Sequence, residues 1–300
     1  MLAIVIPYYK HTFFEATLQS LANQTDKRFK VYIGDDASPE NPGDLLSKYK
    51  EQFDFVYKRF ESNLGGISLI KQWDRCIAMT KDEEWIMILG DDDSMSDTCI
   101  EDFYSNLDEI EANGYNLLRF ASKVDDVVNN KLSGIFTHPK LEKSTDFFFR
   151  RLSNETRSSL SEYVFKKSSY DTFGFHNYNL AWYADDRAWF EFSDFGYVFS
   201  INSSFLNIGL SDENISRKDY KNEEKQAVAL RFYQYLIEEH LAKFDRKQRK
   251  RLLLYYEQLI YNSKNPSFQF WVLMFVSFLS SFYLVQSLKF TRRLLIHLNK

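Results

Sequence analysis

Hydrophobic and polar positions along residues 1–120 alternate between short apolar runs and longer amphipathic segments. The apolar runs have the length of strands and end at turn residues, whereas the segments between them carry apolar residues at helical spacing. The expected strands are Leu2–Pro7, Lys30–Gly34, Phe53–Tyr57, Glu84–Leu89 and Asn116–Phe120. The expected helices are Phe13–Gln24, Pro42–Gln52, Gly66–Met79 and Ile100–Ala112. This alternation predicts an α/β fold, in which helices cover both faces of a mostly parallel sheet.

The pattern becomes less regular after residue 120. Short strands are expected at Tyr163–Phe165 and Tyr197–Ile201, around an aromatic-rich and acidic stretch. Residues 221–262 have the periodicity of two helices. We therefore expect one α/β domain over residues 1–215 and a C-terminal helical region over residues 216–300.

The C-terminal region contains a long uncharged segment. No residue between Lys264 and Lys289 is charged, and Phe268–Val285 is mostly apolar. As one helix, this segment would extend about 36 Å, close to the lower limit for a membrane span. A basic flank of the kind found at the cytoplasmic membrane face follows it, namely Lys289, Arg292, Arg293, His297 and Lys300. We expect residues 268–288 to associate with a membrane. The alternative is a helix buried against its own domain, with an outward face formed by Ser277, Ser280 and Ser281.

Composition narrows the class of protein. With 44% hydrophobic and 27% charged residues, the chain is typical of a folded globular protein. Its net charge of −4 gives no case for nucleic-acid binding. The only cysteines, Cys76 and Cys99, exclude a disulfide framework and favour a reducing compartment. The start lacks the basic and apolar regions of a signal peptide, so we expect a cytoplasmic protein.

Three polar clusters follow expected strands. Asp91, Asp92 and Asp93 come directly after a buried strand, where adjacent carboxylates are costly unless a cation neutralises them. Mg²⁺ and Mn²⁺ take such oxygen ligands together with phosphate oxygens, although a solvated acidic loop has the same composition. Asp35 and Asp36 follow the second strand. One of them could accept hydrogen bonds from a nucleobase or ribose, or both could belong to a simple turn. Asn63, Gly65 and Gly66 precede a helix, where glycines allow close approach to an anion or form only a turn.

In this order, the clusters resemble glycosyltransferase family 2, the inverting nucleotide-sugar transferases with the GT-A fold. The resemblance covers residues 1 to about 210 and rests on these segments: Ile4–Tyr9, Asp35–Ser38, Asn63–Gly66, Asp91–Asp93 and Trp182–Trp189. It implies a Rossmann-like mixed, mostly parallel sheet with a nucleotide-sugar-binding half over residues 1–120 and an acceptor half over 121–215. A C-terminal helical extension would follow.

The resemblance also assigns roles to residues of the donor half. Pro7 and Tyr8 would line the nucleotide pocket, and Asp36, or else Asp35, would bind the base, usually uracil. The triplet would occupy the place of the DxD motif, with Asp92 as the principal metal ligand, Asp93 beside it and Asp91 at the donor. Many members have an aspartate where this chain has Gly90. A divalent cation, Mg²⁺ or Mn²⁺, and a UDP-sugar are therefore the expected cofactor and donor.

In the acceptor half, Asp185 and Asp186 are the candidates for the catalytic base. The resemblance aligns Asp186 with the base itself, although the pair would equally cap a helix and bind Arg187. Trp182 and Tyr183 are expected near the acceptor, whereas core packing explains most other aromatic residues, including Phe147–Phe149. Arg217, with Lys218, either closes over the diphosphate or forms part of a solvated surface.

The expected function is transfer of a sugar to a glycan or lipid-linked acceptor in polysaccharide synthesis, at the inner face of the cell membrane. Two alternatives remain open at this point. A nucleotidyltransferase would normally have a glycine-rich loop after the first strand, and the chain has none there. A catalytically inactive scaffold or sugar-binding protein at the membrane is the other, because Gly90 replaces one carboxylate of the motif.

Overall fold

The computed structural model describes residues 1–210, 222–262, 268–281 and 283–298. The chain divides into two compact units, Met1–Lys218 and Asp219–Lys300. Arg217 and Lys218 lie outside the described residues, so their expected place over the diphosphate stays a prediction.

The first unit contains a mixed sheet and the helices that cover it. Its strands are β1 (Leu2–Tyr8), β2 (Phe29–Asp35), β3 (Phe55–Arg59), β4 (Trp85–Ile88), β5 (Ser94–Met95), β6 (Leu117–Asp126), β7 (Lys131–Leu132), β8 (Leu141–Lys143), β9 (Tyr163–Lys166) and β10 (Tyr197–Leu210). Its α-helices are α1 (Phe14–Ala22), α2 (Gly43–Ser47), α3 (Leu69–Ile77), α4 (Cys99–Ala112), α5 (Ser144–Leu152), α6 (Lys167–Phe173) and α7 (Ala184–Phe192). Two 3₁₀ turns, η1 (Leu160–Glu162) and η2 (Asn179–Ala181), precede β9 and α7.

The main path through the sheet runs β3-β2-β1-β4-β9-β6-β10-β5. The first four strands are parallel, β9 is antiparallel to both of its neighbours, and β10 is parallel to β6. In this register Tyr8 at the end of β1 pairs with Asp35 at the end of β2. The carboxyl ends of β1, β2 and β4 therefore meet at one edge, where ligands bind in open α/β sheets.

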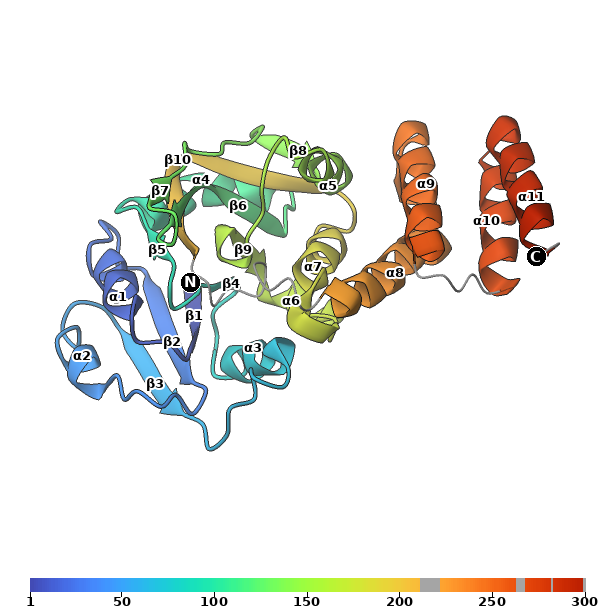
Figure 1. Ribbon diagram of the computed structural model, residues 1–300. Coiled ribbons are helices and arrows are strands. Elements are labelled where there is room, and N and C mark those ends of the chain that lie inside the picture. Colours follow the sequence, from blue (N-terminus) through green and yellow to red (C-terminus); the bar gives the residue numbers. More distant parts are fainter. Residues whose placement is uncertain (211–221, 263–267, 282, 299–300) are drawn as a thin grey trace. The chain divides into compact units, whose positions relative to one another are not determined.

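The apolar core explains this arrangement. Alternate residues of β1, namely Leu2, Ile4 and Ile6, are fully buried with Leu18 and Leu21 of α1 in one hydrophobic cluster. The intervening residues Ala3 and Val5 are also fully buried, on the face that α3 covers. A strand buried on both faces reads as a continuous apolar run, which is why the sequence pattern found it (Figure 1).

The expected mostly parallel α/β sheet is confirmed, with local differences in its elements. Strand β3 starts at Phe55, because the ring of Phe53 packs on Phe29, 6.0 Å away, before strand pairing begins. Helix α3 starts only at Leu69, where the hydroxyl of Ser68 accepts a bond from the backbone of Lys71. Strand β10 continues past its expected end through an irregularity between Ile201 and Phe205.

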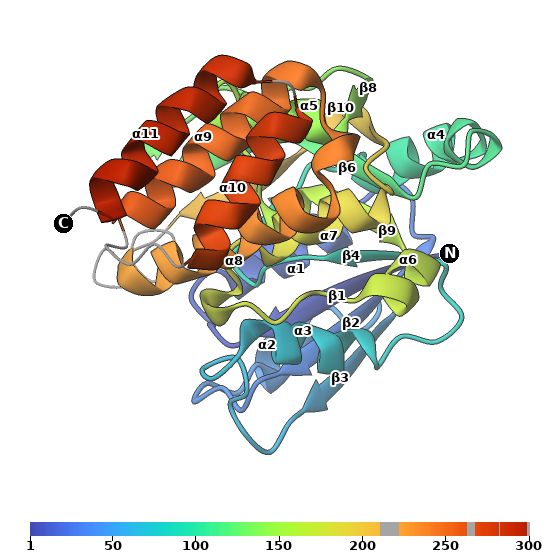
Figure 2. The same ribbon diagram turned by 90° about the vertical axis from the view of Figure 1, so that its right-hand side faces the viewer.

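The second unit is helical in its described residues. Its elements are α8 (Asn222–Glu239), η5 (Leu241–Lys243), α9 (Arg246–Asn262), α10 (Phe268–Ser280) and α11 (Leu284–Leu298). Helix α10 packs beside α9 and α11 (Figures 1 and 2), with ring centroids 5.0 Å apart between Trp271 and Phe290. No helix in the described ranges has both the length and the apolar character needed to cross a membrane.

The expectation of one helix through the uncharged segment is wrong. Helix α10 ends at Ser280 and α11 begins at Leu284, because folding back buries the aromatic face of α10 against Phe290. The alternative with three outward serines is also wrong in detail. Ser277 and Ser281 are buried and only Ser280 is exposed.

Candidate active site

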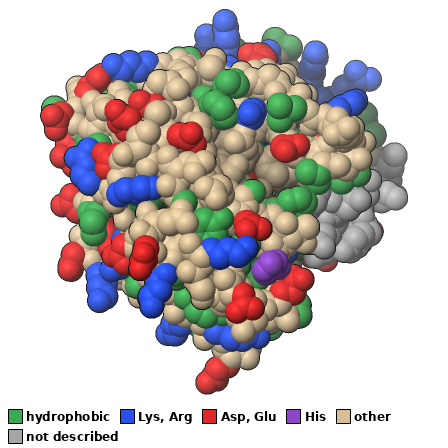
Figure 3. Space-filling view, turned by 90° about the vertical axis from the view of Figure 1, so that its left-hand side faces the viewer, with side chains coloured by type: hydrophobic (Ala, Val, Ile, Leu, Met, Phe, Trp, Pro, Cys, Tyr) green, Lys and Arg blue, Asp and Glu red, His purple; other side chains and the backbone are tan. Residues whose placement is uncertain are grey.

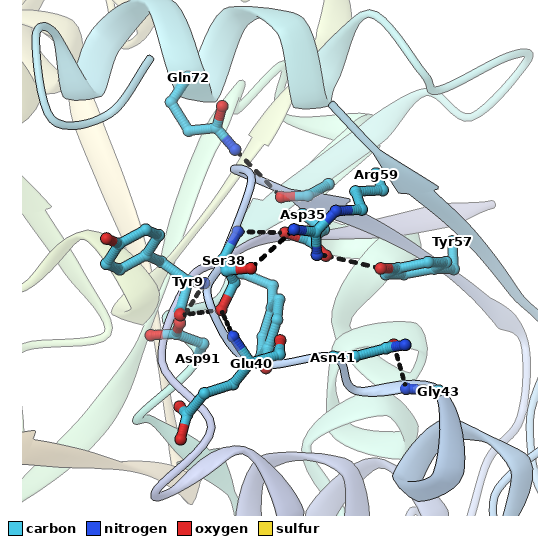
Figure 4. Close-up of polar contacts among 12 residues, drawn as sticks. Tyr9, Asp35, Ser38, Glu40, Asn41, Gly43, Tyr57, Arg59, Gln72 and Asp91 are labelled. Carbon is cyan, nitrogen blue, oxygen red and sulfur yellow. Dashed lines mark hydrogen bonds and ion pairs between the residues drawn. The ribbon is translucent and has the colours of Figure 1, made fainter. Parts of the chain in front are cut away.

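The acidic triplet lies in the turn that follows β4, at the carboxyl edge of the sheet. Asp91 is buried, and its Oδ2 accepts the backbone N–H of Tyr9 (Figure 4) and that of Lys10, each at 2.7 Å. Its own carbonyl accepts a bond from the hydroxyl of Thr17 at 3.2 Å. Burial raises the pKa of Asp91 to about 6, although the two N–H donors oppose the rise. Asp91 therefore ties the end of β4 to the loop after β1.

Asp93 is held by two donors from distant parts of the chain. The backbone N–H of Gly209 donates to Oδ1 at 2.9 Å, and the Ser161 hydroxyl donates to Oδ2 at 2.5 Å. The same hydroxyl accepts the backbone N–H of Gly90 at 3.0 Å. Burial raises the pKa of Asp93 to about 7, and the negative charge of Asp92 adds to this effect. The two hydrogen bonds thus fix the position of the Asp93 carboxylate, but nearby positive charge does not fully offset the effect of its burial.

Asp92 lies between these two aspartates and is the least buried of the three. Its Oδ2 is 3.6 Å from the Nζ of Lys10. With Asp93 and Asp125, it lines a cavity of about 100 Å³ whose other side is formed by the start of α1 and the end of β10. Asp92 is therefore the member of the triplet that a ligand reaches most readily.

The donor set of the triplet suits a hard divalent cation, because it consists of carboxylate oxygens with raised proton affinity. In the described part of the chain, no three His, Cys, Asp or Glu side chains converge as a metal cluster. An ion held by Asp92 and Asp93 would take its remaining ligands from donor phosphates and water, the usual arrangement for Mg²⁺. The residues present therefore fit such an ion.

Gly90 has a steric role in this turn. A Cβ atom at this position would lie 2.8 Å from Asp93 Oδ2 and 3.0 Å from Asp92 Oδ1. Both distances are too short for an undisturbed contact, so the backbone of residue 90 serves as the surface against which the two carboxylates rest. A side chain at residue 90 would therefore displace one or both of these carboxylates.

Asp35 and Asp36 organise the loops at the ends of β2 and β3. Asp35 is fully buried, and its Oδ2 accepts bonds from Tyr57 at 2.6 Å and Arg59 at 2.9 Å (Figure 4). Its Oδ1 accepts the backbone N–H of Ser38 at 2.8 Å. These contacts fix the turn that follows β2 and occupy both oxygens of Asp35.

Asp36 holds the glycine-containing loop. Its Oδ1 accepts the N–H of Leu64 at 2.6 Å and pairs with Arg75, whereas its Oδ2 accepts the N–H of Gly65 at 2.8 Å. Burial raises the pKa of Asp36, an effect that the two N–H groups and Arg75 partly offset. Each carboxylate oxygen has two lone pairs, so Oδ2 retains one acceptor position. A Cβ atom on Gly65 would lie 2.5 Å from that oxygen, which explains the glycine.

The other expected donor residues lie near these loops. Tyr8 is fully buried against Phe14, with ring centroids 4.6 Å apart, and its hydroxyl donates to the carbonyl of Glu40 at 3.1 Å. Pro7 is half-buried. Asn63 accepts the backbone N–H of Gly66 at 2.6 Å. Tyr8 and Asn63 thus support the shape of the loops through internal hydrogen bonds.

Asp185 and Asp186 lie in the first turn of α7. Asp186 is buried and forms an ion pair with Arg151 of α5, 2.6 Å away, whereas Asp185 is less buried. Burial raises the pKa of Asp186 to about 7, Arg151 opposes the rise and Asp185 adds to it. Burial also raises the pKa of Asp185. A carboxylate that titrates near neutral pH is suited to accept a proton from a hydroxyl group.

The chain that leads into α7 has an uncommon backbone. Leu180, Ala181 and Tyr183 all have positive φ angles, of 61°, 53° and 62°. Non-glycine residues in this region cost free energy and often occur at functional sites. Trp182 and Tyr183, the expected acceptor residues, are half-buried on this segment. Phe147–Phe149 are buried and belong to the packing of the unit, as expected.

Residues around η1 connect the two acidic clusters. Ser161 contacts Asp93, and two residues later the ring of Tyr163 stacks on Trp189 of α7, with centroids 4.2 Å apart. Trp189 lies on the same helix as Asp185 and Asp186. One short segment of chain thus packs against both the triplet and the candidate base helix.

Comparison with known proteins identifies this arrangement. The sequence profile described as Glycosyl transferase family 2 matches residues 3–174, more than half of the chain. The chain belongs to glycosyl transferase family 2. The expected family is thereby confirmed, whereas Asp185 and Asp186 lie beyond the matched residues and their roles stay predictions. No curated protein matches the chain.

Solved structures of S. aureus TarS share the fold of this family 2 member. TarS 1-349 in complex with UDP-GlcNAc matches with a TM-score of 0.65 and 13% identity, over 93% of this chain and 80% of that chain. TarS 1-349 in complex with UDP gives 0.62 and 13%, over 87% and 72%. A longer TarS structure gives 0.62 and 14% over 87% of this chain, which spans 43% of its length. At this identity the likeness establishes the GT-A fold.

Several site residues of this transferase escaped the sequence pattern. Ser161, Gly209 and Arg151 contact the acidic clusters from η1, β10 and α5 rather than from the motifs themselves. Lys10 also contacts the triplet, through Asp92. It directly follows the segment Ile4–Tyr9 at the end of β1, and this position in the sequence was the one feature that could have marked it as a site residue. On the face drawn in Figure 3, acidic and basic side chains are interspersed.

Proposed function

We propose that this family 2 glycosyltransferase transfers a sugar, with inversion, from a UDP-sugar to a saccharide acceptor and that it depends on a divalent cation. The observation that carries the proposal is the triplet at the sheet edge, where burial raises the pKa of Asp91 to about 6 and that of Asp93 to about 7. Such a site gains most from a ligand that brings positive charge, as a cation–diphosphate complex does. We assign the donor to residues 1–120 and the acceptor to residues 121–215.

The proposed donor pocket is formed by the loops after β1, β2 and β3. The free acceptor position on Asp36 Oδ2 suits the imide N–H of uracil, and Asp35 keeps the adjoining turn in place. TarS has been solved with UDP and with UDP-GlcNAc, and the shared GT-A fold supports the same donor class for this chain. Arg217 would contribute at the diphosphate.

The cation would be Mg²⁺ or Mn²⁺, held by Asp92 and Asp93. When bound, it neutralises charge on the departing diphosphate. Asp91 keeps the loop after β1 against the triplet, and Ser161 and Gly209 orient the carboxylate of Asp93. Lys10, beside Asp92, adds a second positive charge close to the expected position of the diphosphate.

The transfer step requires a base on the acceptor side. In the proposed step the carboxylate of Asp186 takes the proton of an acceptor hydroxyl, whose oxygen forms a bond to the anomeric carbon. The bond between that carbon and the diphosphate oxygen breaks, and UDP leaves with the electron pair. Asp185 would support the step, and Trp182 and Tyr183 would contact the acceptor sugar.

The proposed acceptor is a glycan or a lipid-linked saccharide in polysaccharide synthesis, and the proposed place of work is the inner face of the cell membrane. A thermal-shift series with UDP, UDP-sugars, other nucleotides and nucleoside triphosphates, each with and without Mn²⁺, tests the donor class. We expect stabilisation by UDP-sugars that needs Mn²⁺ and is lost in Asp92→Asn. Stabilisation by nucleoside triphosphates alone would indicate a nucleotidyltransferase, and binding without any transfer or hydrolysis would indicate a scaffold.

A further inference from the structure

Helix α10 is apolar on two opposite faces. Its buried face contains Phe270, Trp271, Met274 and Phe278. Its exposed face also consists largely of apolar side chains, which recur at helical spacing: Phe268, Val272, Phe275, Val276 and Leu279. Phe268 is 81% exposed and Val276 is 54% exposed. A helix on the surface of a soluble domain normally has a polar outer face, so this one requires another explanation.

Helix α11 continues the same kind of surface. Its exposed apolar residues are Leu284, Val285, Leu288, Leu295 and Ile296, and Leu288 is 73% exposed. Lys289 and Arg292 are exposed within the same arc of the helix. The opposite side of α11 carries the buried Phe290, which packs on Trp271 of α10. The exposed faces of two contacting helices are therefore apolar, with cations among the apolar residues.

Further cations lie beside the turn between the two helices. Arg246, Lys247 and Lys250 of α9 line a cavity of about 430 Å³ together with Leu284 and Val285. A neighbouring cavity of about 350 Å³ is lined by Arg246, Arg249, Ser280, Ser281 and Tyr283. No acidic residue follows Glu257 in the sequence, and Glu257 itself is buried and paired with Arg293, 2.6 Å away. Among the described residues of α9, α10 and α11, cations therefore outnumber acidic residues, and the exposed Asp245 just before α9 compensates only one of them.

We propose that these elements form a docking surface for a membrane rich in anionic phospholipid. The surface consists of the exposed faces of α10 and α11 and the cations Arg246, Lys247, Lys250, Lys289 and Arg292, and we call it the basic apolar surface. Its apolar residues enter the boundary between headgroups and acyl chains, and its cations contact lipid phosphates. Helix α10 has 13 residues and extends about 20 Å, so it lies on the bilayer and does not span it.

Charge favours a membrane over a second copy of the chain as the occupant. Two copies packed through the basic apolar surface would bring cations against cations, because its cations outnumber the acidic residues beside it. An anionic membrane compensates the same cations. The inference rests on the proposed function only for the expectation that the enzyme works at a membrane.

Flotation of the full chain with vesicles tests the inference. The probes are vesicles of phosphatidylcholine alone and of phosphatidylcholine with phosphatidylglycerol. We expect flotation with the anionic vesicles and little with the neutral ones. Lys289→Gln with Arg292→Gln should weaken binding about fivefold for each charge removed. Val276→Asp with Leu288→Asp should abolish it. The matched controls are Leu132→Asp and Lys131→Gln on β7, where Leu132 is 62% exposed in the first unit, and these should float like the wild type.

Three results would overturn the inference. Equal flotation with neutral vesicles would remove the role of the cations. If the protein floats with neither kind of vesicle, a membrane is not the occupant. If the wild type is a dimer and the double variant Val276→Asp with Leu288→Asp is a monomer, the surface binds a second copy of the chain. UDP-sugar binding in solution is measured for every variant. If the chain binds UDP-sugar but does not float, docking is refuted and the proposed transferase function stands. If it floats but does not bind UDP-sugar, the proposed function is refuted and docking stands.

Discussion

The hydroxyl of Ser161 connects the backbone of Gly90 to the carboxylate of Asp93, accepting from the first and donating to the second. Ser161 lies in η1, far from the triplet in sequence, and it contacts Asp93, whose pKa burial raises to about 7. A donor to a carboxylate favours its charged form. We therefore expect cation binding by the triplet to depend on a residue outside the motif.

Replacing Ser161 with alanine tests this dependence. Loss of the donor raises the pKa of Asp93 further, by about one unit for a hydrogen bond to a charged group. Binding of Mn²⁺ in the presence of UDP should weaken at pH 7 and recover as the pH rises, which calorimetry at several pH values measures. Ser159→Ala is the matched control, since no hydrogen bond of its hydroxyl to another described residue is present. Wild-type affinity of Ser161→Ala at every pH would contradict the prediction.

Asp91 and Asp92 should respond differently to mutation. Asp91→Ala leaves the N–H groups of Tyr9 and Lys10 without their acceptor, at about 1–3 kcal/mol each. Its free energy of unfolding should fall accordingly in urea titrations. Asp92→Asn removes a more exposed carboxylate and should leave stability within about 0.5 kcal/mol while it abolishes the effect of Mn²⁺. Equal losses of stability in the two variants would refute this division of roles.

The pH dependence of transfer should report the base. Asp186 must be ionised to accept a proton, and burial raises its pKa to about 7, so kcat/KM should increase with pH around that value. Arg151 lowers the pKa of Asp186, and Arg151→Gln should therefore move the rise to higher pH by about 1–3 units. Arg150→Gln serves as the control, because Arg150 binds Glu142 and His138 instead. An unshifted profile in Arg151→Gln would remove Asp186 from the role of base.

The loop at Gly65 gives a steric test of the donor pocket. A Cβ atom there would lie 2.5 Å from Asp36 Oδ2, so Gly65→Ala should cost about 1–3 kcal/mol of stability and weaken UDP binding. Gly134→Ala is the control, because its Cβ would meet no atom within 4 Å. Thermal unfolding with and without UDP measures both effects. If the two alanine variants bind UDP equally well, the loop does not shape the pocket.

The sequence pattern predicted the sheet and the acidic triplet for physical reasons. Buried strands such as β1 are continuous apolar runs, and Asp91–Asp93 are adjacent, so neither requires knowledge of distant contacts. Ser161 and Arg151 approach the site only through the tertiary arrangement of η1 and α5, which no local period encodes. The sequence pattern did not predict the break between α10 and α11 for a similar reason. The segment is apolar and contains no glycine or proline, and the break depends on the packing of Trp271 on Phe290.

Release of UDP from UDP-sugars, with and without Mn²⁺, tests the central claim most directly when the wild type and Asp92→Asn are compared at pH 8. The account predicts Mn²⁺-dependent release by the wild type and a loss of at least about 100-fold in Asp92→Asn, with unchanged thermal stability. Equal release by the two proteins, or release that is indifferent to Mn²⁺, would contradict it.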